Sequence, residues 1–120
     1  MLIKQKAAAQ GNYLDAEVEY AIALFNGTGT EKDEAAAVTL LGKAAREGSP
    51  IAQNRLARIL AAGRGAPADP VGATKWHLIA KAAGESDPWL DAFIGNLKPP
   101  DREAGEKAAK PWLTNLPPRT

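Results

Sequence analysis

The sequence predicts an all-α protein in which antiparallel helix pairs stack side by side into a solenoid. Three observations predict this fold class: a 36-residue internal repeat, apolar residues at helical spacing, and start and stop signals around the expected helices. Nine of the 33 residues from 16 to 48 recur unchanged 36 positions later, and in the first copy they are Ala16, Ala21, Leu24, Gly27, Gly29, Asp33, Ala37, Ala44 and Gly48. All nine are packing or turn residues, which is typical of a stacked repeat that retains its architecture and varies elsewhere.

Capping residues and glycines mark the helix boundaries. A Ser or Asp stands directly before a proline at Ser49-Pro50, Asp69-Pro70 and Asp87-Pro88, and Asp33-Glu34 provides a similar start. The Ser or Asp oxygen accepts a hydrogen bond from the first turn, and Pro at the first helical position leaves no N–H unpaired. Glycines follow the helical runs at Gly27, Gly48, Gly63 and Gly84. The expected helices cover 2–10, 13–26, 34–47, 50–62, 70–83, 88–97 and 100–113. No segment shows the period-two alternation of a strand, so we expect none.

Each repeat contains two helices that are expected to pack against each other. The apolar face of the first helix is formed by Ala16, Tyr20, Ala21 and Leu24 in one copy and by Ala52, Leu56, Ala57 and Leu60 in the other. The second helices carry Ala37, Leu40, Leu41 and Ala44, matched by Ala73, Trp76, His77 and Ala80. One hairpin cannot bury such a face alone, so stacking on a neighbour is expected. The expected organisation is a partial repeat at 1–12, repeats at 13–48 and 49–84, a degenerate terminal repeat with a capping helix at 85–113, and a tail at 114–120.

This combination of spaced residues resembles the Sel1-like repeat of bacterial proteins, a relative of the tetratricopeptide repeat with a unit of about 36 residues. The second copy fits the pattern at Ala52, Leu56, Ala57, Leu60, Gly63, Gly65, Asp69, Ala73, Trp76 and Gly84. It departs in one place, because its Lys81-Ala82-Ala83 lies two residues later than Lys43-Ala44-Ala45 of the first copy predicts. The resemblance implies a right-handed solenoid with a polar closing helix, used as a scaffold that binds proteins or peptides, and the fold itself names no reaction.

Composition excludes several classes of partner. Fifteen basic and fourteen acidic residues give a net charge of +1, so no concentrated basic surface for nucleic acid is expected. The absence of cysteine excludes disulfides, a thiol nucleophile and a Cys-ligated zinc site. No apolar run approaches the ~18 residues of a membrane span, so we expect no membrane partner. The start lacks the apolar core of a signal peptide. The compartment stays open: cytoplasmic if the chain is complete, periplasmic if an upstream signal is missing.

Candidate catalytic residues are few. His77 is the only histidine, and no metal-ligand or nucleophile–base motif accompanies it, so we expect a structural role. Gly27-x-Gly29 and Gly63-x-Gly65 follow no predicted strand and lack Gly-Lys-Ser/Thr, which indicates turns and not phosphate loops. We therefore expect no catalytic residue, no metal and no cofactor.

Tryptophans and arginines offer less specific signals. Trp76 is expected in the core, whereas Trp89 and Trp112 are expected to pack the end cap, with ligand stacking as the alternative. Arg55, Arg58 and Arg64 form a basic strip without interleaved aromatic residues, for which solvated surface is the default interpretation and contact with an acidic peptide the alternative.

A second stripe on the first helix of each repeat is expected to face the concave groove of the solenoid. In the first copy this stripe holds Asp15, Val18, Glu19, Ile22 and Asn26, and in the second Ile51, Asn54, Arg55, Arg58 and Ala62. An apolar-acidic patch beside an amide-basic patch suits an extended or helical peptide. In the alternative interpretation, Val18 and Ile22 are covered by a preceding repeat.

The preferred functional hypothesis is a non-catalytic scaffold or adaptor that binds a protein or peptide on its concave face. Two alternatives remain: a small hydrolase or drug-binding repeat protein of β-lactamase-like type, and a purely structural segment of a longer repeat array. Apolar surface near Leu2, Ile3 and 7–9 also predicts concentration-dependent pairing into a homodimer through the N-terminal half-repeat.

Overall fold

The structure is a computed structural model that describes residues 13–114. This part of the chain forms six helices and no strand: α2 (Tyr13–Asn26), α3 (Glu34–Arg46), α4 (Pro50–Ala62), α5 (Pro70–Ala82), α6 (Pro88–Gly95) and α7 (Pro99–Thr114). The predicted all-α class is confirmed, and six expected helices appear with ends shifted by no more than two residues. The expected helix at 2–10 and the predicted dimer contact near Leu2 and Ile3 lie outside the described residues.

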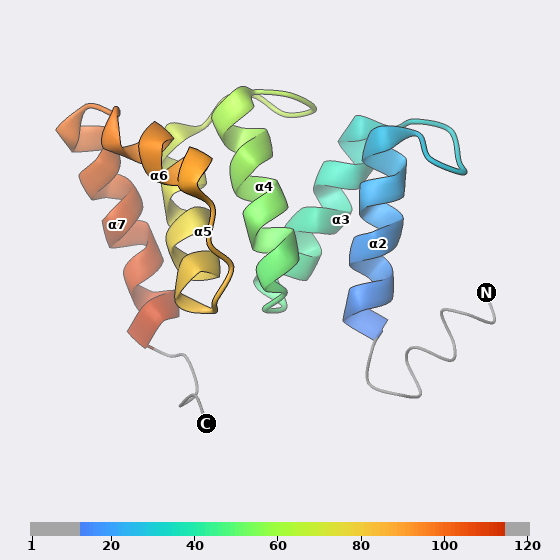
Figure 1. Ribbon diagram of the computed structural model, residues 1–120, viewed down its shortest axis with the longest axis horizontal. Helices are drawn as coiled ribbons and strands as arrows, with labels where there is room; N and C mark the ends of the chain where they lie inside the picture. The colour runs from blue at the N-terminus through green and yellow to red at the C-terminus, as the bar shows by residue number, and fades with distance from the viewer. Residues whose placement is uncertain (1–12, 115–120) are drawn as a thin grey trace.

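The helices form a row that begins at α2 and ends at α7 (Figure 1). Each of α2, α3 and α4 packs on the next helix along the chain, and α5 then packs most closely on α7. The short helix α6 makes only light contact with α4 and α5. Helices α2 and α4 are therefore the first members of two hairpins, and α7 closes the far end of the stack.

Four helices begin with the predicted side-chain cap. The Ser49 hydroxyl accepts a hydrogen bond from the Ala52 amide at 3.1 Å, and carboxylates of Asp33, Asp69 and Asp87 do the same for α3, α5 and α6. Each cap contributes about 1 kcal/mol. The helix starts are thus determined locally, as the sequence predicts.

The two Gly-x-Gly turns have the same geometry. Gly27 and Gly63 follow the first helix of their copies with φ of 73° and 70°. After each turn, the amide of the next capping aspartate bonds to a helix carbonyl, from Asp33 to Leu24 at 2.8 Å and from Asp69 to Leu60 at 2.9 Å. The 36-residue repeat in the sequence is therefore also a repeat of backbone conformation, as predicted for turn glycines.

Alanines allow the helices to approach closely across the stack. Fully buried examples are Ala21, Ala37, Ala44, Ala57, Ala73 and Ala80. One expected core residue is misplaced: Tyr20 is 53% exposed, although its counterpart Leu56 is buried. The reason is position in the row, because Leu56 lies on α4, between α3 and α5, whereas α2 lies at the start of the row and packs chiefly on α3.

The last helix closes the stack by tight packing on α5. Trp112 meets Trp76 edge to face, with ring centroids 5.1 Å apart. Gly105 is buried directly against Thr74, and a Cβ atom at this position would overlap the threonine Cβ. Trp112 thus takes the packing role expected for the end cap, and Trp89 does not, since it is 49% exposed.

Candidate functional site

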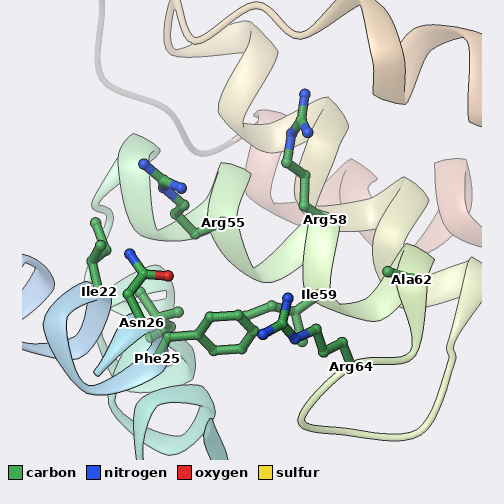
Figure 2. A pocket seen from close by; sticks show the side chains of 9 residues that line it. Ile22, Phe25, Asn26, Arg55, Arg58, Ile59, Ala62 and Arg64 are labelled. Atoms are coloured by element: carbon green, nitrogen blue, oxygen red, sulfur yellow. The ribbon is translucent and has the colours of Figure 1, made fainter. Parts of the chain in front are cut away.

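A pocket of about 270 Å³ lies between α2 and α4, the first helices of the two hairpins. It is lined by Ile22, Phe25, Asn26, Leu41, Arg55, Arg58, Ile59, Ala62 and Arg64. Figure 2 shows Ile22, Phe25 and Asn26 on one side and residues of α4 on the other. The pocket exists because side chains of two successive repeats meet there, and neither repeat forms it alone.

The base of the pocket is apolar and belongs to the core. Leu41 of α3 and Ile59 of α4 are both buried, and Phe25 and Ile22 pack against the same core cluster. Apolar surface that the fold holds in place favours the burial of a partner's apolar side chain.

Arg64 forms one rim of the pocket from the second Gly-x-Gly turn. Its Nε donates a hydrogen bond to Glu34 Oε2 at 2.8 Å, and its guanidinium lies 5.1 Å from the Phe25 ring centroid. The neighbouring Gly65 lies against the first repeat, where a Cβ atom would come within 3.3 Å of the Phe25 ring. This close approach places Arg64 over an aromatic ring from the preceding repeat.

Arg58 forms the rim toward α6 and is held by a carboxylate. Its Nε and Nη2 donate to Asp87 at 2.6 and 2.8 Å, and Asn54 also donates to this carboxylate at 2.8 Å. The hydrogen bond from Arg58 is the main reason that the pKa of Asp87 lies well below its usual range, and the same contact raises the pKa of Arg58. The guanidinium also lies 5.1 Å from the Trp89 ring centroid.

Arg55 differs from the other two arginines because no carboxylate among the described residues pairs with its guanidinium. Its side chain is exposed, and no residue among 13–114 forms a hydrogen bond or ion pair with it. Figure 2 shows Arg55 extending from α4 toward the side of the pocket where Ile22 and Asn26 lie. It is therefore a cation available to a ligand at the mouth of the pocket.

The family profile described as "Sel1 repeat" matches residues 14–49 and 50–85, which together make up more than half of the chain. The chain belongs to the Sel1 repeat family. The resemblance seen in the sequence is thus confirmed. Sel1 repeats generally mediate protein–protein interactions.

A Sel1 repeat protein from Oxalobacter formigenes, known from its crystal structure, has a similar fold. The TM-score is 0.59 at 23% sequence identity, and the similarity covers 96% of this chain and 97% of that one. At this identity the likeness concerns the fold alone, and it agrees with the predicted solenoid. A search of curated proteins found no match.

Four of the nine predicted binding residues of this Sel1 repeat chain line the pocket, namely Ile22, Asn26, Arg55 and Arg58. Asp15, Glu19 and Ile51 are exposed but lie outside its lining, and Asn54 bonds to Asp87. The expectation for Val18 is wrong, because it is 3% exposed and belongs to the core cluster. The helical stripe was assigned too broadly on α2, and Val18 points into the hairpin.

Sequence reasoning missed Phe25, Leu41, Ile59 and the pocket position of Arg64. Phe25 lies one turn after Ile22 on α2, and Ile59 lies one turn after Arg55 on α4, so helical spacing carried some signal for both. No aromatic residue is interleaved with the arginine strip in the sequence, yet the fold places two rings beside it: Trp89 contacts Arg58, and Phe25 contacts Arg64. Both rings come from outside α4, which explains why the local sequence did not show them.

His77 has the structural position that its equivalence to Leu41 in the Sel1 repeat predicts. The ring is fully buried, and Nε2 lies 2.7 Å from Asp91 Oδ1, which also accepts from Lys81 Nζ at 3.1 Å. The buried Nδ1 has no hydrogen-bond partner among the described residues. His77 therefore joins α5 to α6 and presents no nitrogen to solvent.

Two further site types have no candidate within residues 13–114. No group of three or more His, Cys, Asp or Glu side chains gathers there to hold a metal ion. None of the helices in this range has the length and apolar character needed to cross a membrane.

Proposed function

We propose that this chain is a non-catalytic scaffold that binds a protein or peptide partner on the face formed by α2 and α4. One observation carries the proposal: the pocket between successive repeats combines a buried apolar base with exposed arginine side chains. Such a combination gives both affinity and orientation to a bound segment.

The size of the pocket favours a partner's side chains over a separate small molecule. Its volume of about 270 Å³ is below the roughly 300–1,000 Å³ of sites that enclose drug-sized ligands. One apolar side chain and a polar neighbour fit such a space, with the rest of the partner lying along the helices.

The surroundings of the histidine support a non-catalytic role. A general base must reach the proton that it removes, and the His77 ring is fully buried with one nitrogen on Asp91. A Ser or Thr nucleophile would need the other nitrogen, and Nδ1 contacts no hydroxyl among the described residues.

Site-specific photo-cross-linking tests the proposal. A photoreactive amino acid replaces Asn26, an exposed residue of the pocket lining, and as a matched control it replaces Thr39, an exposed residue of α3 outside the lining. Both proteins are irradiated in an extract of the cells that produce the chain. We expect discrete adducts from position 26, suppressed by excess wild-type protein, and none from position 39.

Adducts of equal yield from both positions would contradict a specific face. No adduct from position 26, while far-ultraviolet circular dichroism shows the helices intact, would also overturn the proposal.

A further inference from the structure

We infer that the pocket between α2 and α4 recognises a carboxylate side chain of the partner, next to an apolar residue, with Arg55 as the anchoring cation. The occupant is thus an acidic peptide segment in which Asp or Glu adjoins a residue such as Leu or Ile. This inference rests on the proposed function and names the chemistry of the segment that the pocket accepts.

The first step is the charge of the lining. Three arginines and no carboxylate line the pocket. Arg58 pairs with Asp87, and Arg64 pairs with Glu34, whose Oε2 also lies 3.6 Å from Lys32 Nζ. Both carboxylates approach from outside the lining. Arg55 has no such partner among residues 13–114. The pocket therefore carries one uncompensated positive charge, which matches one carboxylate.

The second step concerns the donors that remain. A guanidinium carries five N–H donors. Asp87 accepts from Nε and Nη2 of Arg58, and no residue among 13–114 accepts from its Nη1. Glu34 accepts from Arg64 through Nε, which leaves both terminal nitrogens of that arginine. Because their ion pairs already hold these two side chains, a ligand that bonds to them loses little side-chain entropy on binding.

The third step concerns the apolar residues that line the pocket together with Arg55. Ile22 and Ile59 belong to the same lining as Arg55, with Leu41 behind them at the base. A residue next to the partner's carboxylate can therefore place an apolar side chain on these residues. Exclusion of water by that side chain strengthens the ion pair at Arg55.

A phosphoryl group is a poorer match, because it carries about two negative charges near neutral pH and the pocket has one uncompensated cation. Nucleic acid is poorer still, since it requires an extended row of free cations. A carboxylate matches the single uncompensated guanidinium in charge and can accept two parallel hydrogen bonds from it.

Selection from a displayed library of random dodecapeptides tests the inference. Three baits are compared: the wild-type chain, Arg55→Glu, and Lys107→Glu as a matched charge reversal on the exposed surface of α7. We expect the wild type and Lys107→Glu to enrich peptides with Asp or Glu beside an apolar residue. Arg55→Glu should lose these peptides and enrich Lys or Arg at the same place.

A synthetic peptide from the wild-type selection then gives the magnitude. Its dissociation constant should rise about tenfold or more when its acidic residue becomes Gln or when Arg55 becomes Glu, the loss expected for one charge-assisted contact. Lys107→Glu should leave it within about twofold, because that residue lies outside the pocket lining.

The outcomes separate the inference from the proposed function. Enriched peptides that bind equally well after Arg55→Glu or after Glu→Gln would overturn the carboxylate anchor, while the photo-cross-link at position 26 could still support a binding face. A phosphoserine version that binds more than about tenfold tighter than the Glu version would overturn the choice of carboxylate. Cross-linking at position 26 combined with no enriched peptide would overturn a short acidic segment as the occupant.

Discussion

Arg58 of α4 holds Asp87, the residue before α6, through two parallel hydrogen bonds of 2.6 and 2.8 Å. The same carboxylate caps α6 by accepting from the Leu90 amide at 3.2 Å. Helix α6 has only eight residues and packs lightly on its neighbours. One side chain therefore both starts this helix and attaches it to the preceding repeat, while it fixes the arginine at the rim of the pocket.

We expect Asp87→Ala to lower the free energy of unfolding by about 2.5–4 kcal/mol. The substitution removes a helix cap, at about 1 kcal/mol, and a charge-assisted contact to Arg58, at about 1.5–3 kcal/mol. Urea unfolding followed by circular dichroism measures the change. The matched control is Asp33→Ala, since Asp33 caps α3 by the same geometry and has no arginine partner within the described residues; it should lose only about 1 kcal/mol. Equal losses in both variants would show that the Arg58 contact contributes nothing.

The pH dependence of the unfolding free energy should report the contact between Asp87 and Arg58. The pKa of Asp87 is lowered in the folded protein, chiefly by the hydrogen bond from Arg58, so the unfolded chain binds its proton first as the pH falls. The contribution of Asp87 is complete above the pKa of unfolded aspartate, about 3.9, and is lost as the pH falls below that value toward the lower folded pKa. Asp87→Asn should therefore reduce the slope of unfolding free energy against pH between about pH 5 and about pH 3, a range that brackets the unfolded pKa. An unchanged slope would contradict this assignment.

His77 should tolerate leucine better than alanine. His77 is buried, its Nδ1 has no hydrogen-bond partner within the part of the chain that the structure describes, and the first repeat has Leu41 at the same place. Leucine removes the unsatisfied nitrogen, and Asp91 keeps its contact with Lys81, so we expect a change within about 1 kcal/mol. His77→Ala leaves a cavity and should cost about 2–4 kcal/mol. Thermal and urea unfolding distinguish the two, and an equally large loss for leucine would mean that the bond to Asp91 dominates.

Gly105 should not accept a side chain. A Cβ atom at this position would overlap Thr74 Cβ and lie 3.0 Å from the Val71 carbonyl oxygen, so Gly105→Ala must displace α7 from α5. We expect a loss of about 1–3 kcal/mol. Gly95 is the matched control, because nothing lies within 4 Å of its Cβ position, and there alanine should be neutral or stabilising by up to about 1 kcal/mol. A melting temperature for Gly105→Ala at or above that of the wild type would refute the close contact.

The sequence by itself determined where most helices begin and end, because helix caps and turns follow local rules. Each cap and turn depends on residues only a few positions away, as at Ser49, Asp69, Gly27 and Gly63. Such features can therefore be predicted from the sequence. The 36-residue period then implies stacking, because a lone hairpin leaves its apolar face in water. The shared pocket position of Ile22 and Arg55 follows from helical spacing for the same reason.

Only the tertiary structure decided which side chains on these helices are exposed and which charged groups have a partner. Val18 is buried and Tyr20 exposed because burial depends on which helix lies opposite, and that neighbour is distant in sequence. Asp87 pairs with Arg58, 29 residues away in the sequence, and Glu34 pairs with Arg64, 30 residues away. Arg55 lies on the same helix as Arg58 and has no hydrogen-bond or ion-pair partner among residues 13–114. Helical periodicity gives the direction of a side chain, whereas its charge is neutralised only by a group that the fold brings within hydrogen-bond distance.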